Sequence, residues 1–211
     1  MEKYNKYIEY VNNAFKNSFE RAGGENYRFY HSLNVANTAL KIAKSLNLTE
    51  KQIDIIVLAG LFHDIGKIKR IQENGLLEGS KKYETENNLE RHENISARMV
   101  YDILKNDFSI DTIDTIASII QDDMQDNILA NVLHDADNIS ELGYTNICRL
   151  FTYNYNRSIE YTTDYYINED KKKKETKLPT LHFDISRQIA KERLDNTYDV
   201  LINLKKEIGL E

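Results

Sequence analysis

The chain has 211 residues, of which 41% are hydrophobic and 29% are charged, and it carries a formal net charge of −6. These values exclude a disordered or fibrous chain and predict one globular domain with a substantial core. The acidic balance also argues against a stable nucleic-acid partner, which would need clustered Lys and Arg. The acidic net charge still allows a small phosphorylated ligand, because a metal ion can supply positive charge locally.

Compartment and membrane association follow from two further features of the sequence. The single cysteine, Cys148, rules out an internal disulfide, suits a reducing compartment and is expected to be a small buried hydrophobe. The N-terminus lacks a signal peptide, and no stretch reaches the roughly 18 apolar residues of a membrane helix. We therefore expect a cytoplasmic protein with no membrane partner.

One proline, eight glycines and repeated apolar spacing of 3.6 residues predict an all-α fold. The first helix is expected over about residues 4–19. The second is expected over about 27–46, and it places His31 on the same inward face as Val35, Ala39 and Ile42. His31 is therefore expected to point into the core.

The third expected helix is the most apolar. Thr49 and Gln52 fit a capping box at its start, and Gly66 is expected as the residue just beyond its end near residue 65. Because residues 55–62 are apolar on every side, this should be the central, enclosed helix. His63 and Asp64 then lie buried in its last turn, where both need polar partners.

The rest of the chain continues the helical pattern with two interruptions. Residues 69–88 are polar and glycine-dotted, which indicates a mobile loop. Three helices follow, over about 89–105, from Asp111 onward, and over about 128–142. His92 lies at the inward-facing start of the first of them. Residues 152–181 are rich in tyrosine and lysine and are expected as a loop or excursion. A last amphipathic helix over about 183–208 is expected to dock on the rest.

The candidate ligands of a metal come from four of these helices. They are three histidines and three carboxylates: His31, His63, His92, Asp64, Asp135 and Asp137. Two imidazoles with two carboxylates suit one divalent ion such as Mn²⁺, Fe²⁺, Co²⁺, Ni²⁺ or Mg²⁺ rather than structural zinc. Helical periodicity leaves the choice between Asp135 and Asp137 open, with Asp135 slightly nearer the apolar face. Unfilled coordination positions would allow catalysis.

These residues resemble the H…HD…D signature of the HD-domain metal-dependent phosphohydrolase superfamily, in its HDIG-type, single-domain form. The resemblance rests on His31, on HDIGK at 63–67, on HENIS at 92–96 and on DADNISELG at 135–143, with Arg28 three residues before His31. It covers about residues 27–151. We accordingly expect a single HD-type domain over 1–211, with a core at 27–151, the 152–181 excursion and a docking helix at 182–211.

The resemblance implies an HD-domain-like helical bundle with one metal held by His31, His63, Asp64 and Asp137. Asp137 is favoured over Asp135 because the family's metal-binding aspartate directly follows the alanine of this segment. Asp135 would then contact the substrate or one of the metal-binding residues. Asp64 would orient or deprotonate the nucleophile. A second metal, and with it oxygenase chemistry, is disfavoured because residues 119–123 contain no histidine.

The other catalytic roles also come from the resemblance and from side-chain chemistry. His92 would protonate the leaving oxygen or hold the phosphate. Arg28 can offer a bidentate fork to phosphate, and Lys67 a point charge, although a lysine beyond a helix end also stabilises the helix dipole. His134 and His182 are expected as ordinary surface residues.

The implied activity is hydrolysis of a phosphate ester or phosphoanhydride of a nucleotide or small phosphorylated metabolite, by a phosphatase, nucleotidase or nucleotide pyrophosphatase. The alternative is a non-catalytic metal- and nucleotide-binding regulatory module. The sequence leaves the substrate, the metal and a homo-oligomeric state open.

Overall fold

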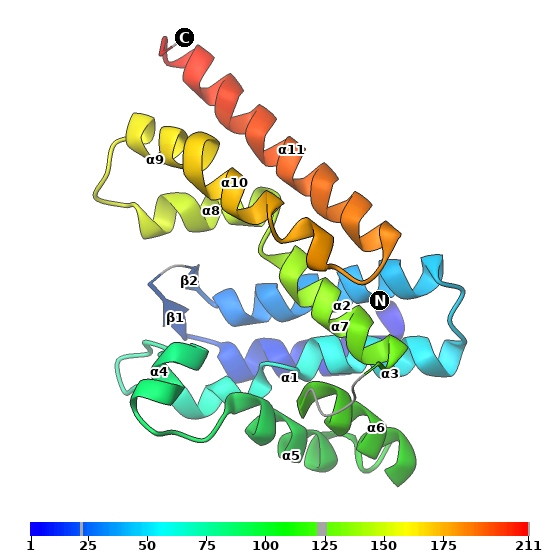
Figure 1. Ribbon diagram of the computed structural model, residues 1–211. Helices are drawn as coiled ribbons and strands as arrows, with labels where there is room; N and C mark the ends of the chain where they lie inside the picture. The colour runs from blue at the N-terminus through cyan, green and yellow to red at the C-terminus, as the bar shows by residue number, and fades with distance from the viewer. Residues whose placement is uncertain (22, 122–125, 211) are drawn as a thin grey trace. The chain divides into compact units, whose positions relative to one another are not determined.

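The computed structural model describes residues 1–21, 23–121 and 126–210 (Figure 1). By its internal contacts the chain divides into two units, Met1–Glu20 with Glu25–Asp137, and Arg21–Gly24 with Asn138–Glu211. Apart from a two-stranded sheet and isolated bridges, the regular structure described is helical, which confirms the all-α prediction. None of the helices described is both long and apolar enough to cross a membrane.

The first unit contains the short η1 (Glu2–Tyr4), the strand β1 (Phe19–Glu20), the 3-10 helix η2 (Ile65–Arg70) and most of the larger helices. These helices are α1 (Asn5–Phe15), α2 (Tyr27–Ser45), α3 (Glu50–Phe62), α4 (Lys81–Glu86), α5 (His92–Leu104), α6 (Ile110–Gln121) and most of α7 (Ile128–Ser140). The strand β2 (Gly24–Glu25) has one residue in each unit. The helix expected to reach residue 19 stops at Phe15, because Lys16 leaves the helical conformation with ψ 134° and Asn17 follows it with a left-handed φ of 64°.

The central helix of this unit is α3. Thr49 and Gln52 form the predicted capping box, in which the Gln52 backbone N–H donates to Thr49 Oγ1 at 3.3 Å and the Thr49 N–H donates to Gln52 Oε1 at 3.0 Å. Every residue from Ile55 to Phe62 is buried, and α3 packs against α1, α2 and α6. The prediction of a central, enclosed helix is confirmed.

The end of α3 differs from the sequence-based prediction. The helix stops at Phe62, and Gly66 lies inside η2 rather than just beyond an α-helix. A Cβ at position 66 would lie 2.4 Å from the His92 carbonyl oxygen, and the Gly66 N–H donates to Ser96 Oγ at 2.8 Å. Gly66 is therefore required for the close approach of η2 to the start of α5, not for a helix cap.

The close packing of α2 on α3 gives a stability prediction. A Cβ on Gly60 would lie 2.9 Å from Ala36 Cα, a backbone atom that cannot move without moving α2. Gly60→Ala is expected to lower the free energy of unfolding by about 1–3 kcal/mol, measured by urea denaturation, because it overpacks a tight interface. Asn37→Ala, on the exposed face of α2, is the control. Equal stability of the two variants would show that this helix contact is not tightly packed.

The second unit contains α8 (Tyr144–Tyr153), α9 (Ile159–Tyr165), the π-helix η3 (Tyr166–Asp170), α10 (Lys171–Glu175), the 3-10 helix η4 (Leu178–Thr180) and α11 (Asp184–Glu207). Segment 152–181, expected as a loop or excursion, is thus largely helical. Tyr165 and Tyr166 of this segment contribute to a core centred on Leu150, Tyr166 and Leu201. Cys148 is exposed, which corrects the prediction that it is buried. The single-domain organisation expected for 1–211 stays a prediction.

Candidate metal centre and active site

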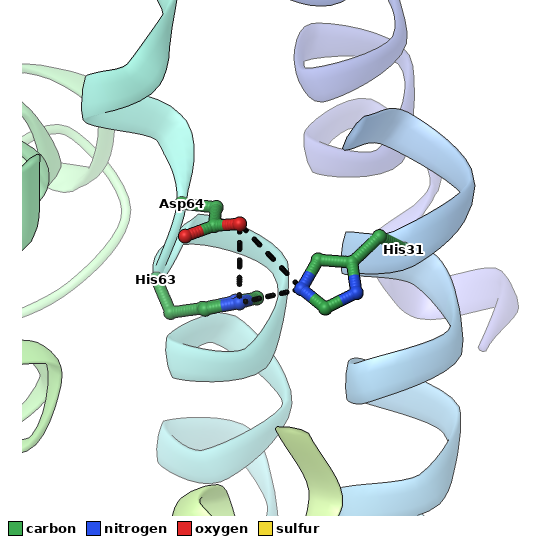
Figure 2. Close-up of side chains that lie close together, drawn as sticks. All are labelled: His31, His63 and Asp64. Atoms are coloured by element: carbon green, nitrogen blue, oxygen red, sulfur yellow. Dashed lines mark hydrogen bonds and ion pairs between the residues drawn. The ribbon is translucent and has the colours of Figure 1, made fainter. Parts of the chain in front are cut away.

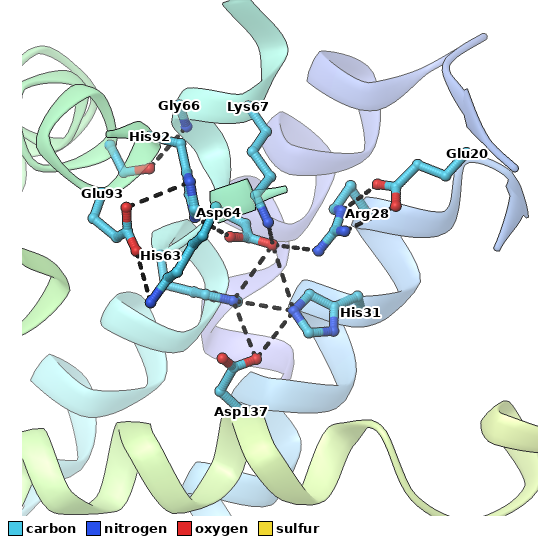
Figure 3. A network of polar contacts seen from close by, with 12 residues as sticks. Glu20, Arg28, His31, His63, Asp64, Gly66, Lys67, His92, Glu93 and Asp137 are labelled. Carbon is cyan, nitrogen blue, oxygen red and sulfur yellow. Dashed lines mark hydrogen bonds and ion pairs between the residues drawn. The ribbon is translucent and has the colours of Figure 1, made fainter. Parts of the chain in front are cut away.

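Four side chains of the first unit converge at one point. His31 comes from α2, His63 directly follows α3, Asp64 precedes η2 and Asp137 comes from α7 (Figures 2 and 3). The two Nε2 atoms of the histidines are 3.1 Å apart. Asp64 Oδ2 lies 3.5 Å from His31 Nε2 and 3.7 Å from His63 Nε2, while Asp137 Oδ1 lies 3.2 and 3.7 Å from the same atoms.

The protonation of His63 fits a metal ligand. Its Nδ1 is 2.9 Å from the Gly60 carbonyl oxygen, which can only accept, so Nδ1 carries the hydrogen and Nε2 presents a lone pair to the centre. Burial lowers the pKa of His63, although the charges of Asp64 and Asp137 oppose that shift. The imidazole is therefore neutral at pH 7, as coordination requires.

The donor atoms of His31, His63 and Asp64 lie close enough together to hold one divalent cation, and Asp137 Oδ1 lies near both histidine nitrogens. Two imidazole nitrogens and two carboxylate oxygens suit an ion of the Mn²⁺ to Ni²⁺ series or Mg²⁺. Ligand atoms bound to one ion at about 2.1 Å lie about 3 Å from each other, close to the contacts found here. His31, His63 and Asp64 are all buried, so the carboxylate is held away from bulk water beside two nitrogen donors.

Asp64 is also the centre of a cationic network (Figure 3). Its Oδ2 is 2.7 Å from Arg28 Nη1 and 3.0 Å from Lys67 Nζ, and its Oδ1 is 3.1 Å from His92 Nε2. Burial alone would raise the pKa of Asp64, but Lys67, His63 and Arg28 hold it well below its usual value. Asp64 is thus ionised, and Arg28, Lys67 and His92, the three further site residues expected from the sequence, lie around it.

Arg28 is fixed by Glu20, a residue that the sequence analysis did not identify. Glu20 lies on β1, and its two carboxylate oxygens pair with Nε and Nη2 of Arg28, the second contact being 2.8 Å long. The side chains of Arg28 and Glu20 are only 14% and 15% exposed. The bidentate Glu20 carboxylate therefore directs the remaining Arg28 Nη1 at Asp64. The only signal in the sequence for the pairing of Glu20 with Arg28 is their separation of eight residues.

His92 has a second unexpected partner, Glu84. Glu84 Oε2 lies 3.0 Å from His92 Nδ1, and Glu84 Oε1 accepts the His92 backbone N–H at 3.1 Å. Both side chains are at most 4% exposed. Since carboxylate oxygens only accept, hydrogen bonds to Glu84 on one side and Asp64 on the other need a proton on each ring nitrogen of His92. Each ring nitrogen of His92 therefore faces a carboxylate.

Glu84 lies in the segment 69–88, which was expected to be a mobile loop. This segment instead contains η2 residues and α4, whose start is capped by the Ser80 hydroxyl accepting from the Tyr83 N–H at 3.1 Å. Glu84, His92 and Glu93 also lie close enough together to hold a metal. Lys81 and Arg91, however, lie 3.0 and 3.1 Å from Glu93 Oε1 and already balance its charge. The cluster therefore fits a histidine held by carboxylates better than a second metal ion.

The two aspartates of α7 have different surroundings. Asp135 is buried and has His134 Nδ1 3.4 Å away, whereas Asp137 contacts His31 and His63 and has a side chain that is 48% exposed. His134 and His182 are exposed, as expected for surface residues. Of the stretch 119–123, on which the one-metal prediction rests, Asp122 and Asp123 lie outside the described residues.

Comparison with known proteins places this site in a family. The chain matches the HD domain over residues 28–142, more than half of its length. It belongs to the HD-domain family, and so to the metal-dependent phosphohydrolases that its sequence resembles. No curated protein matches it.

Several solved structures share the fold. The crystal structure of Bacillus subtilis YpgQ in complex with ADP has a TM-score of 0.60 and 18% identity over 97% of each chain. A predicted HD superfamily hydrolase from an uncultured Thermotogales bacterium has a TM-score of 0.65 and 18% identity, covering 97% of this chain and 92% of that one. An HD-superfamily hydrolase from Bacillus thuringiensis has a TM-score of 0.63 and 17% identity, covering 100% and 98%.

Proposed function

We propose that the protein is a hydrolase that uses one divalent metal to cleave a phosphate ester or phosphoanhydride bond of a nucleotide or small phosphorylated metabolite. The observation that carries this proposal is the convergence of His31, His63, Asp64 and Asp137 beside three basic side chains. Such a site can bind a phosphoryl group and supply a proton to its leaving oxygen. The ADP bound to YpgQ supports a nucleotide as the substrate class.

In this proposal His31, His63, Asp64 and Asp137 hold the metal. When bound, the ion lowers the pKa of coordinated water and polarises a phosphoryl oxygen. Arg28 and Lys67, both on Asp64 Oδ2, are placed to bind phosphate oxygens next to the ligand cluster. The bidentate contact with Glu20 uses Nε and Nη2 of Arg28 and keeps its Nη1 directed at that position.

Proton transfer is assigned to His92. Its Nε2 hydrogen, 3.1 Å from Asp64 Oδ1, is placed to protonate the oxygen that leaves phosphorus when the ester bond breaks. Asp64 accepts the proton of the attacking water and returns it to His92 along the same contact, which restores the starting state. Glu84 acts as a positioning residue, because its two hydrogen bonds fix the ring and keep a proton on Nδ1.

The proposal is tested by removing metal with a chelator, reloading with Mn²⁺, Co²⁺ or Ni²⁺, and screening nucleoside mono-, di- and triphosphates together with small phosphomonoesters. We expect metal-dependent release of phosphate or pyrophosphate from at least one of them. His134→Ala, which changes an exposed histidine outside the proposed site, is the control and should retain activity. Tight nucleotide binding with no release under any condition would instead support a non-catalytic regulatory module.

A further inference from the structure

A separate hollow of about 660 Å³ lies in the second unit, lined by residues of α8, α9, η3 and α10 together with Glu141 and Lys177. Figure 1 shows where these helices lie in the chain. All of its lining residues belong to that unit, and none belongs to the metal centre. Its volume falls within the range of about 300–1,000 Å³ that is typical of small-molecule sites. The hollow is therefore large enough for a ligand the size of a mononucleotide.

The charges around this hollow are predominantly positive, in a chain with a net charge of −6. Four cationic side chains and two carboxylates line it: Arg149, Lys173, Lys174, Lys177, Glu141 and Asp170. Arg149 lies 3.3 Å from Glu141, and Lys174 lies 2.6 Å from Asp170, so the two carboxylates are already paired. Within the part of the chain that the structure describes, Lys177 makes no ion pair. Lys173 in turn lies 3.8 Å from Glu169, which is outside the lining, so the positive charge that an anion would find here is chiefly that of Lys177.

Lys174 is the best fixed of these cations. Its side chain is 16% exposed, and its Nζ donates to Asp170 Oδ2 at 2.6 Å and to Asn146 Oδ1 at 2.8 Å. These two contacts use two of the three ammonium hydrogens. Burial lowers the pKa of Lys174, and Asp170 opposes that shift. The third ammonium hydrogen would donate to a bound anion.

Tyrosine rings accompany these charges on the same lining. Tyr153 is 69% exposed and Tyr161 is 47% exposed, and the guanidinium of Arg157 lies 5.1 Å from the centre of the Tyr161 ring. Lys173 Nζ lies 5.6 Å from the centre of the Tyr165 ring, so cations and aromatic faces adjoin. Such faces stack on nucleobases irrespective of base identity.

We propose that this hollow binds a nucleoside phosphate, with the phosphate near Lys174 and Lys177 and the base against Tyr153 or Tyr161. The combination of a concave surface, excess positive charge and exposed aromatic rings carries the proposal. It does not depend on the proposed hydrolase function, since it needs neither the metal nor turnover. The site would make the second unit a nucleotide sensor.

The test measures AMP binding to the full-length, metal-free protein by titration calorimetry, with adenosine and inorganic phosphate as the two halves of the ligand. AMP is expected to bind more tightly than either half. Lys177→Glu should weaken AMP binding about tenfold or more. Lys172→Glu, an equal charge change on an exposed lysine that does not line the hollow, should weaken it less than twofold.

A second matched pair tests the aromatic part. Tyr153→Ala should weaken AMP binding several-fold while leaving inorganic phosphate binding unchanged, whereas Tyr155→Ala, 85% exposed and outside the lining, should alter neither. Because Lys177 and Tyr153 are exposed, these variants are expected to fold normally. Absence of AMP binding to the metal-free protein, or equal losses from Lys177→Glu and Lys172→Glu, would overturn the proposal.

Discussion

Asp64→Ala is expected to abolish both metal binding and turnover. The substitution removes a proposed ligand and also the only carboxylate described in contact with Arg28 Nη1, Lys67 Nζ and His92 Nε2 together. Metal content after reloading and dialysis, measured by plasma emission spectrometry, should fall from about one ion per chain to background. Phosphate release should fall with it, because the nucleophile is no longer activated.

Asp64→Ala also leaves buried cations without their counter-ion, which can cost about 3–5 kcal/mol of stability. His31→Ala therefore serves as the second variant, since it removes one proposed ligand and leaves Asp64 paired with Arg28 and Lys67. Circular dichroism establishes that each variant is folded. If folded His31→Ala and Asp64→Ala bind metal as tightly as the wild type, the ligand assignment is wrong.

His92→Ala is expected to keep the metal but to lose rate. His92 contacts Asp64 through Nε2 and Glu84 through Nδ1, and it is not one of the four proposed metal ligands (Figure 3). Its removal therefore leaves all four ligands in place. Removing a general acid lowers kcat by about 10²–10⁴-fold. Steady-state kinetics beside metal analysis separates the two effects, with KM for the substrate changing much less than kcat.

Glu84→Gln refines this prediction for the positioning residue. It keeps the shape of the side chain but removes the charge that holds a proton on His92 Nδ1. We expect kcat to fall about 10- to 100-fold with metal content unchanged, as is typical for partners of site histidines. Loss of metal in His92→Ala would contradict the one-metal assignment, and an unchanged kcat in Glu84→Gln would remove Glu84 from the mechanism.

The parts of the fold that were predictable depend on local sequence signals. The capping box at Thr49 and the continuous apolar run to Phe62 define α3 because both effects act within a few residues. The same is true of His31, whose inward direction follows from its spacing to Val35. Periodicity alone could not choose between Asp135 and Asp137, since both lie on α7 two residues apart; only the motif favoured Asp137.

Partners that are brought together by the packing of separate elements could not be predicted. Glu84 and Glu20 are ordinary acidic residues in sequence, and their importance arises only because α4 meets the start of α5 and β1 meets the start of α2. Gly66 shows the same limitation. Its position after a helical pattern suggested a cap, whereas the actual requirement is the space next to the His92 carbonyl, which comes from tertiary packing.

The most direct test of the account titrates metal-free protein with Mn²⁺ while recording bound metal and phosphate release from the substrate found in the screen. We predict that activity rises in proportion to bound metal and reaches its plateau at one ion per chain, held by His31, His63, Asp64 and Asp137. Activity that is complete without metal, or that rises only as a second ion binds, would contradict a single-metal phosphohydrolase.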